Sequence, residues 1–245
     1  MEQAVILAGG RAERMRPHTD SRPKAMVEVG GAPIVEHQLR WLGANGVTSV
    51  VLSVGYRADV IQAHVGGGSR YGIEVVYAVE DEPLGRGGGL KLASRHLPEP
   101  SGAWLALNGD VITNFRVDEL AAQHERIGAI ATVALAPYRS NWGVAELEGE
   151  LIRRFVQSPR LPYWINAGIY AMQPDVAALL PDKGDHEDST FPELAKEGRL
   201  GAYFIRGYWR GIDTVKDIRE AGLELEQMQL MVAPQDEATP SVEPG

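Results

Sequence analysis

The chain has no cysteine among its 245 residues. That absence excludes disulfide bridges, zinc–thiolate sites, cysteine nucleophiles and thiol redox chemistry. Histidine is scarce too, since only six are present, and they are scattered without the spacing of metal ligands. The sequence therefore offers no metal site of the cysteine or histidine type.

A surplus of positive charge is also missing. The chain carries 24 basic and 33 acidic residues, which gives a net charge of −9. Such an acidic chain is a poor candidate for nonspecific binding to nucleic acids or anionic membranes. No apolar run approaches the roughly 18–20 residues that span a bilayer, and the N-terminus lacks the basic region of a signal peptide. We therefore expect a cytoplasmic protein without nucleic-acid or membrane partners.

The composition itself is that of an ordinary globular protein. Apolar residues make up 44% of the chain and charged residues 23%, so disorder of the whole chain is excluded. A chain of this length buries roughly 70–75% of its unfolded surface, which is enough for a core without covalent crosslinks. We expect one domain over residues 1–232. Residues 233–245 are rich in Pro, Glu, Gln and Ser, and we expect a disordered tail there.

Short apolar runs alternate with helical patterns in the first half. The runs predict buried strands at 4–8, 47–54, 73–79 and 103–107, and the helical patterns fall at 33–44, 57–65, 89–97 and 117–126. This alternation predicts an α/β fold with a Rossmann-like, doubly wound sheet. Ligands of such sheets bind at the C-terminal ends of the strands. The loops at 9–24 and 108–110 follow strands, so they are the candidate site.

The second half is less regular. Its patterns predict strands at 130–136, 143–147, 151–155, 167–172 and 201–206, with helices at 174–180 and 215–232. Residues 147–150 predict a hairpin turn, and residues 182–188 predict an acidic surface loop. The second half therefore adds a small β-rich insertion to a mixed, mainly parallel sheet.

The loop after the first strand combines glycines with positive charge. Gly9 and Gly10 let the backbone approach a ligand closely, with N–H groups that can point at phosphate oxygens. Residues 1–25 hold five basic and three acidic side chains, so this stretch is positive within an acidic protein. A polyphosphate site is one interpretation, and a solvated basic surface loop is the other. The spacing is neither that of the P-loop nor that of the dinucleotide fingerprint.

This loop also contains a recognisable sequence motif. It begins with Leu-Ala-Gly-Gly-Arg at residues 7–11 and continues with Arg14, Pro17, Thr19, Pro23, Lys24 and Met26. The stretch resembles the N-terminal signature of the sugar-1-phosphate nucleotidylyltransferases, also called nucleoside-diphosphate-sugar pyrophosphorylases, of the mannose-1-phosphate guanylyltransferase-like type. It departs from their pattern at Ala12, Glu13 and Ala25, where the family has Gly, Thr and usually Pro.

Four further motifs extend the resemblance to about residue 218. Residues 80–89 are similar to the family's nucleotide loop, and Asn-Gly-Asp at 108–110 matches the motif whose Asp holds the metal. Asn-Ala-Gly-Ile-Tyr at 166–170 resembles the sugar-site strand, and residues 207–214 resemble the segment with a second metal Asp. Five motifs in the family's order exceed what chance would place in one chain.

The resemblance implies the nucleotide-diphospho-sugar transferase fold and a Mg²⁺-dependent reaction. In that reaction a sugar 1-phosphate attacks the α-phosphate of a nucleoside triphosphate, and pyrophosphate leaves. The resemblance divides the domain into a nucleotide-binding half at about 1–128, a sugar-phosphate-binding half at about 129–214 and the C-terminal helix 215–232. Nucleoside triphosphate and sugar 1-phosphate are the implied partners, and homo-oligomers are common among the members.

The resemblance also implies a role for each matching residue. Arg14, Lys24 and Asp110 are implied to be catalytic, and Asp110 and Asp213 to hold the metal. The implied nucleotide-binding residues are Leu7, Ala8, Gly9, Gly10, Arg11, Ala12, Glu80, Gly85, Gly87, Gly88 and Asn108. The implied sugar-phosphate-binding residues are Gly143, Arg160, Asn166, Ala167 and Gly168. The glycines of 85–88 are expected to let backbone groups reach the base. Glu80 either accepts from a guanine edge or is a solvated carboxylate.

Two departures from the family pattern leave alternatives open. The second metal Asp often lies two residues after the Trp, where this chain has Gly211; Asp213 takes that role here, and it also suits a helix N-cap. The Lys of the family's Glu-Lys-Pro is replaced by Ser158, and Arg160 or Arg206 is left as a substitute.

The identity of the substrates is open as well. Members with Gln near the nucleotide loop tend to take pyrimidine nucleotides, and residues 76–91 contain no Gln, which favours GTP. Mannose 1-phosphate, or a related hexose or heptose 1-phosphate, is the favoured sugar, and UTP-, CTP- and dTTP-dependent members are alternatives. A nicotinamide dehydrogenase is disfavoured because its glycine fingerprint is absent. A non-catalytic nucleotide or sugar-phosphate sensor is the other interpretation of the departures.

Overall fold

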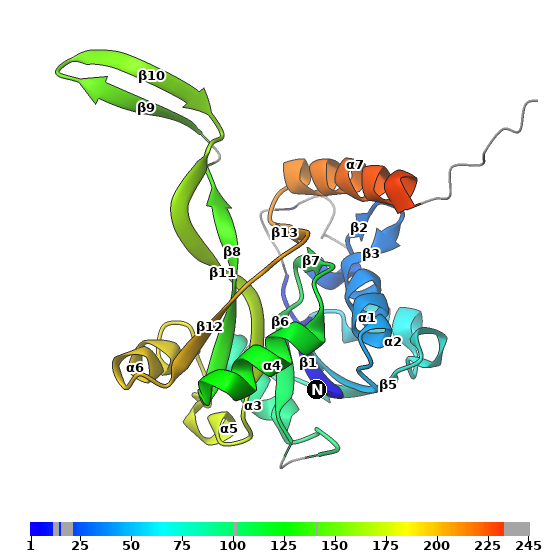
Figure 1. The fold of residues 1–245 in the computed structure, drawn as a ribbon. Coiled ribbons are helices and arrows are strands. Elements are labelled where there is room, and N and C mark those ends of the chain that lie inside the picture. Colours follow the sequence, from blue (N-terminus) through cyan, green and yellow to red (C-terminus); the bar gives the residue numbers. More distant parts are fainter. Residues whose placement is uncertain (12–14, 16–21, 100–101, 141, 233–245) are drawn as a thin grey trace, which may run out of the picture.

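The fold is centred on a seven-stranded sheet. The computed structural model describes residues 1–11, 15, 22–99, 102–140 and 142–232. The sheet has the order β12-β8-β11-β6-β1-β4-β5, and its neighbours run parallel except at β11, which is antiparallel to β6 and β8. Its strands are β1 (Gln3–Leu7), β4 (Ser49–Val54), β5 (Glu74–Val79), β6 (Trp104–Asn108), β8 (Ala131–Arg139), β11 (Arg160–Met172) and β12 (Leu200–Phe204). The expected mixed, mainly parallel α/β sheet is therefore confirmed (Figure 1).

The central strands are buried on both faces, as their apolar sequences predict. In β1, Ala4 and Ile6 belong to the core cluster on one face of the sheet, and Val5 belongs to the cluster on the other. All three side chains are fully buried. A strand covered on both faces needs no polar alternation, which explains why its sequence is a continuous apolar run.

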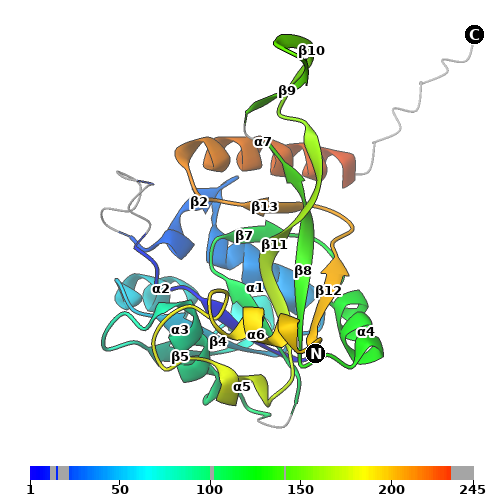
Figure 2. The ribbon, with the colours of Figure 1, turned by 90° about the vertical axis from the view of Figure 1, so that its left-hand side faces the viewer.

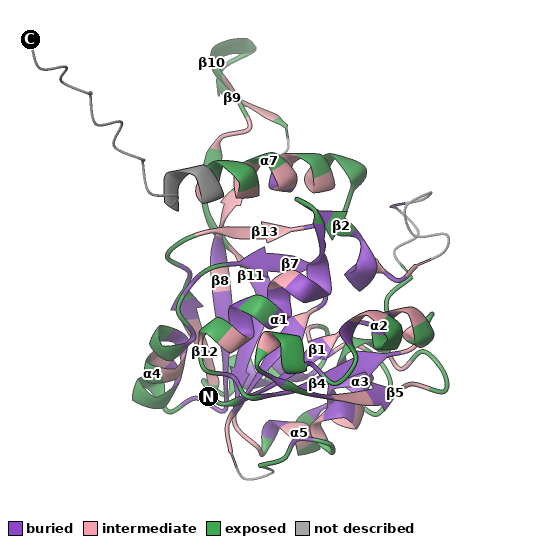
Figure 3. Cartoon of the chain, turned by 90° about the vertical axis from the view of Figure 1, so that its right-hand side faces the viewer, coloured by how far each residue is buried: buried purple, intermediate pink, exposed green. Residues whose placement is uncertain are grey.

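Helices cover both faces of this sheet. Side chains of α1 (Ile34–Ala44), α2 (Ala58–Val65) and α4 (Val117–Ile127) pack on the face of Ala4 and Ile6. Side chains of α3 (Gly85–Ser94), α5 (Val176–Leu179) and α6 (Thr190–Lys196) pack on the face of Val5. Figure 3 shows the buried residues concentrated between these helices. Because β1, β4 and β6 are parallel, their C-terminal ends lie at the same edge of the sheet.

A smaller apolar cluster lies beyond that edge. It joins Ile112, Ile212 and Ala221 to residues of the first 34 positions. Its elements are the short ladders β2 (Glu28–Val29) with β3 (Ala32–Pro33) and β7 (Val111–Thr113) with β13 (Trp209–Gly211), together with helix α7 (Val215–Val232). The 3-10 turns η2 (Lys24–Met26) and η3 (Ser69–Tyr71) complete the described elements. None of the described helices is long and apolar enough to cross a membrane.

A two-stranded arm projects from the body. It consists of β9 (Gly143–Glu148) and β10 (Leu151–Gln157), joined by the turn that the sequence predicts. Figures 1 and 2 show it extending beyond β8 and β11. Leu147 pairs with Ile152, and both are exposed, whereas the opposite face carries the ion pair between Glu146 and Arg154.

Two expectations about the boundaries of elements are wrong, and one helix was not expected. Helix α3 begins at Gly85 rather than at residue 89, although glycine disfavours helices, because the chain at 181–186 packs on this turn. Strand β11 begins at Arg160 rather than at residue 167; Pro162 falls where the pairing with β8 is irregular, so no ladder bond is lost there. Helix α6 follows directly after the acidic loop and was not expected. The expected tail at 233–245 lies outside the described residues.

Candidate active site

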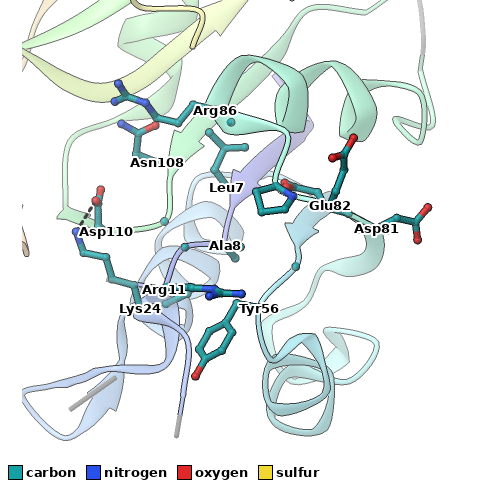
Figure 4. Close-up of a pocket in the computed structure, with 18 residues that line it drawn as sticks. Leu7, Ala8, Arg11, Lys24, Tyr56, Asp81, Glu82, Arg86, Asn108 and Asp110 are labelled. Atoms are coloured by element: carbon teal, nitrogen blue, oxygen red, sulfur yellow. Dashed lines mark hydrogen bonds and ion pairs between the residues drawn. The ribbon is translucent and has the colours of Figure 1, made fainter. Parts of the chain in front are cut away.

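A pocket of about 610 Å³ lies at the C-terminal ends of β1, β4 and β6. This is the edge at which a parallel sheet binds its ligands, and the volume is in the range of small-molecule sites. Figure 4 shows the side chains that line it. The lining includes ten of the residues expected from the sequence: Leu7, Ala8, Gly9, Gly10, Arg11, Lys24, Glu80, Gly85, Asn108 and Asp110.

Lys24 lies between two carboxylates at this pocket. Its Nζ donates to Oδ2 of Asp110 at 2.7 Å and to Oδ1 of Asp213 at 2.8 Å. Burial opposes the charged form of the ammonium, but the two carboxylates outweigh burial and raise the pKa of Lys24 above its usual 10.5. The two expected metal ligands therefore converge on one cation. Among the described residues, no third acidic or histidine side chain joins them as a metal-binding group.

Three local structures bring these residues together. Lys24 begins η2, whose last residues are buried in the core. Asp110 precedes β7, and the antiparallel pairing of β7 with β13 places the chain before Asp213 alongside it. Asp213 comes just before α7, where Oδ2 of Asp217 accepts from the amide N of Asp213 at 3.2 Å and of Thr214 at 2.9 Å. The side chain of Asp217 therefore caps the helix and fixes the backbone that carries Asp213.

The first glycine loop allows close packing at the pocket floor. A Cβ at Gly9 would lie 3.2 Å from the amide N of Gly55, and one at Gly109 would lie 2.2 Å from the carbonyl O of Leu7. Arg11 extends over the ring of Tyr56, with 5.2 Å from its Cζ to the ring centroid. This places a guanidinium at the pocket, where it suits an anionic ligand.

Glu80 has both carboxylate oxygens engaged within the protein. Oε1 accepts from the Ser53 hydroxyl at 3.0 Å, and Oε2 accepts from the amide N of Leu84 at 3.1 Å. The carboxylate thus holds the chain that leads into α3. Glu80 also lines the pocket. It therefore shapes the nucleotide loop, whether or not it also contacts a base.

The three glycines of this loop do not share one environment. Gly85 lines the pocket, with φ of +77°. Gly87 and Gly88 are buried beneath residues 181–186 instead. A Cβ at Gly87 would lie 2.6 Å from Cγ of Pro181, and one at Gly88 would lie 2.6 Å from the carbonyl O of Asp182. Their lack of a side chain therefore allows close packing between two protein segments.

The five expected sugar-phosphate residues fall into two groups. Gly168 adjoins the pocket, because a Cβ there would lie 2.7 Å from Nδ2 of Asn108, and Asn166 accepts from its amide. Ala167 is buried, and its carbonyl accepts from the indole of Trp209 at 2.8 Å. Gly143 and Arg160 lie at the base of the arm and are not part of the pocket lining.

Two predicted residues lie outside the described part of the chain, and some of the residues that line the pocket were not predicted. Arg14 and Ala12, expected to bind phosphates, lie outside the described residues. Arg86 and Tyr56 line the pocket but were not expected to. Arg86 stands inside the nucleotide loop where the family pattern has Thr, and that departure was the available signal. Tyr56 follows a predicted strand by two residues, and only its place at the sheet edge marked it.

Known proteins share this arrangement. A family model described as "Nucleotidyl transferase" matches residues 3–228. This chain belongs to the nucleotidyl transferase family. It is 36% identical over 224 residues to the mannose-1-phosphate guanyltransferase of Candida albicans and 37% identical to that of Aspergillus oryzae. Each alignment covers 88% of this chain, and the chain spans 62% of the length of these relatives.

Two solved structures share the fold. A putative glucose-1-phosphate thymidylyltransferase from Bacillus anthracis superposes with a TM-score of 0.72 at 21% identity, covering 91% of this chain and 94% of that one. HddC from Yersinia pseudotuberculosis superposes with a TM-score of 0.74 at 23% identity, covering 92% of this chain and 100% of that one. These structures confirm the expected nucleotide-diphospho-sugar transferase fold.

Proposed function

We propose that this protein transfers a guanylyl group from GTP to mannose 1-phosphate or a related hexose or heptose 1-phosphate. The products are an NDP-sugar and pyrophosphate. One observation carries the proposal: Lys24, Asp110 and Asp213 meet at the pocket that also contains the glycine loop and Arg11. The relatives that share over a third of its residues carry the name mannose-1-phosphate guanyltransferase, which supports both substrates. The absence of Gln from 76–91 agrees with GTP.

The donor set fits a magnesium ion. Asp110 and Asp213 already share one cation, the ammonium of Lys24, so the site favours positive charge between them. Mg²⁺ prefers hard oxygen ligands, accepts one or two carboxylates and takes its other ligands from water and substrate phosphates. When bound, the ion supplies neutralisation of phosphate charge. Asp110 and Asp213 would hold it.

The remaining groups bind and orient the two anionic substrates. Catalysis of this transfer rests on bringing the reactants into line and on balancing charge, so it needs no protein nucleophile. The amides of Gly9 and Gly10 suit the triphosphate, and Arg11 and Lys24 supply positive charge beside it. Asn166 and Gly168 suit the sugar-phosphate side because they adjoin Asn108 of the pocket. Residues 1–128 then form the nucleotide-binding half and 129–214 the sugar-phosphate-binding half.

The test is pyrophosphate release in Mg²⁺, with each of GTP, UTP, CTP and dTTP crossed against a panel of sugar 1-phosphates. We expect the highest kcat/KM with GTP and mannose 1-phosphate or a close relative of that sugar. A higher kcat/KM with another nucleotide would replace the guanylyl assignment and keep the reaction class. Silence from a folded protein that binds a nucleotide would favour the sensor.

A further inference from the structure

The acidic segment, residues 182–188, packs against both halves of the candidate site. The amide N of Gly184 donates to the carbonyl O of Leu84 at 2.8 Å, and that of Gly87 donates to the carbonyl O of Gly184 at 2.9 Å. These backbone bonds attach the segment to the start of α3, which carries the nucleotide loop. The side chain of the same segment that reaches the sugar-phosphate side is Glu187.

Glu187 is held by a donor from each half. Nη1 of Arg86 lies 2.9 Å from its Oε2, and the hydroxyl of Tyr170 donates to its Oε1 at 2.6 Å. Its amide N donates to Oδ1 of Asp185 at 2.9 Å, and Nε of Arg86 donates to the other oxygen of Asp185 at 2.5 Å. The guanidinium at the pocket is therefore fixed by two carboxylates of one short segment.

Tyr170 extends the network to the sugar-phosphate side. Nδ2 of Asn166 donates to the Tyr170 hydroxyl at 3.0 Å, and Oδ1 of Asn166 accepts from the amide N of Gly168 at 2.8 Å. Tyr170 is fully buried. Burial, together with the Glu187 carboxylate, holds the pKa of the phenol well above its usual 10. The hydroxyl thus stays protonated, donates to Glu187 and accepts from Asn166.

This network fixes the orientation of an exposed amide. Asn166 is exposed, and both ends of its amide are bonded within the protein while one N–H remains for a ligand. Without Tyr170 and Glu187, the amide would keep only its bond to Gly168. Orientation by a buried partner lowers the entropy lost on binding, because the side chain is ordered in advance.

We propose that Glu187 is a positioning residue, which acts through Tyr170 to orient Asn166 toward the sugar 1-phosphate while it holds Arg86 at the nucleotide loop. This inference rests on the proposed function. Neither Glu187 nor Tyr170 lines the pocket. Tyr170 therefore reaches a substrate through Asn166, whereas Glu187 also reaches the nucleotide side through Arg86, which does line the pocket. The expected signature is a change in the KM for the sugar 1-phosphate, because Asn166 lies on that side.

The test compares Tyr170→Phe, Glu187→Ala and Glu187→Gln. In Tyr170→Phe we expect the KM for the sugar 1-phosphate to rise about five- to tenfold, the effect of one lost hydrogen bond, with kcat and the KM for the nucleotide within about twofold. Glu187→Ala should raise the same KM too, but by no more than Tyr170→Phe, because the Tyr170 hydroxyl remains to accept from Asn166. Glu187→Gln should recover most of the loss, because its amide oxygen still accepts from the Tyr170 hydroxyl.

Tyr203→Phe is the matched control. It also removes a tyrosine hydroxyl that donates to a carboxylate, Oε2 of Glu119 at 3.0 Å, but on α4 and away from the pocket. We expect its kinetics to equal those of the unaltered protein. Equal rises in both KM values of Tyr170→Phe, no rise at all in that variant, or the same rise in Tyr203→Phe would overturn the proposal.

A second measurement keeps the two proposals separate. If the unaltered protein turns over no pair of substrates, the proposed function fails, and exchange of the Gly168 amide then tests the network by itself. We expect that amide to exchange at least about fivefold faster in Tyr170→Phe and Glu187→Ala, since its acceptor on Asn166 is less ordered. Unchanged exchange in both variants contradicts the positioning role.

Discussion

The backbone amide of Ile212 donates a hydrogen bond to the carbonyl oxygen of Asp110, with an N···O distance of 2.8 Å. This bond continues the β7–β13 ladder, in which Gly211 pairs with Val111. Asp213 is the next residue, so the ladder sets its carboxylate beside that of Asp110, and Lys24 bonds to both. Two acidic residues from distant parts of the chain thus become one site through a pair of three-residue strands.

Asp110→Asn is expected to reduce turnover at least about a hundredfold, since charge stabilisation by a bound metal contributes several kcal/mol. The amide side chain has nearly the size of the carboxylate, but it lacks the negative charge that Asp110 contributes beside Asp213. The melting temperature should stay within a few degrees. Steady-state pyrophosphate release and thermal denaturation measure the two effects. Asp118→Asn, at an exposed aspartate on α4, is the control and should keep full activity. A fully active Asp110→Asn protein would remove Asp110 from the metal site.

Asp217→Ala is expected to weaken the start of α7 and, with it, the placement of Asp213. Oδ2 of Asp217 accepts from two backbone amides and from the Thr214 hydroxyl at 2.8 Å. Losing this cap should lower the free energy of unfolding by about 1–2 kcal/mol and raise the Mg²⁺ concentration needed for half-maximal activity. Denaturant melts and a Mg²⁺ titration measure both.

Glu220→Ala is the matched control for that variant. Glu220 shares the partner Arg210 with Asp217, but no hydrogen bond links it to 213 or 214 among those described. It should lose little stability and keep the Mg²⁺ requirement unchanged. An equal Mg²⁺ shift in both variants would assign the effect to Arg210 rather than to the cap.

Acidification is expected to destabilise the protein through His186. This side chain is fully buried, neither ring nitrogen has a hydrogen-bond partner, and its ring packs edge-on against Tyr170 and Phe191. Burial lowers the pKa of His186 to about 4, although Asp185 and Glu187 partly oppose that shift and Arg86 adds to it. In the unfolded chain the imidazole of His186 therefore takes up a proton near pH 6.5, whereas in the folded protein it takes up that proton only near pH 4. About 3 kcal/mol of stability is lost as the pH falls through that window.

Urea denaturation between pH 7 and pH 4 tests this dependence. His186→Phe should flatten the curve relative to the unaltered protein, whereas His96→Phe, at an exposed position, should leave its slope unchanged. Part of the slope should persist in His186→Phe, because burial also lowers the pKa of His124. Identical slopes in all three proteins would show that His186 is not buried in its neutral form.

Gly88→Ala is expected to destabilise the protein although alanine is the better helix former. A Cβ at this position would lie 2.6 Å from the backbone carbonyl O of Asp182, and overpacking costs about 1–3 kcal/mol, more than the roughly 1 kcal/mol of helix propensity gained. The matched control is Gly222→Ala in α7, where the nearest atom would lie 3.5 Å away, so propensity should prevail there and stability should rise. Chemical denaturation of both variants measures whether the free energy of unfolding falls in Gly88→Ala and rises in Gly222→Ala.

The sequence predicts the sheet well because buried parallel strands have a distinctive pattern. The run at 4–8 is apolar without interruption, the run at 47–54 is apolar except for Thr48, Ser49 and Ser53, and both overlap central strands. The pattern fails where tertiary contacts override local preference. Four glycines in α3 indicate a loop, yet Glu80 bonds to the amide of Leu84 and the acidic segment packs on the turn. The contact with the acidic segment joins residues far apart in the chain, and no local rule contains it.

The same contrast between local patterns and distant contacts separates the site residues that were predicted from those that were not. Gly9, Gly10 and Lys24, which line the pocket, were predicted from a contiguous signature. Arg86 and Glu187 were missed, since their roles depend on a contact between two distant segments. Gly143 and Arg160 were expected at the sugar phosphate but lie at the arm, because a motif fixes the order of residues and not the path of the chain between them.

The start of α3 packs closely against residues 181–186, so the shape of each segment depends on the other. A Cβ at Gly87 would lie 2.6 Å from Cγ of Pro181 and 2.9 Å from the amide N of His186. A chimera that receives the nucleotide loop of a relative with Ala there would push this segment off the helix, and the ion pairs of Arg86 with it. Recombination between members should therefore succeed only when both stretches come from the same parent.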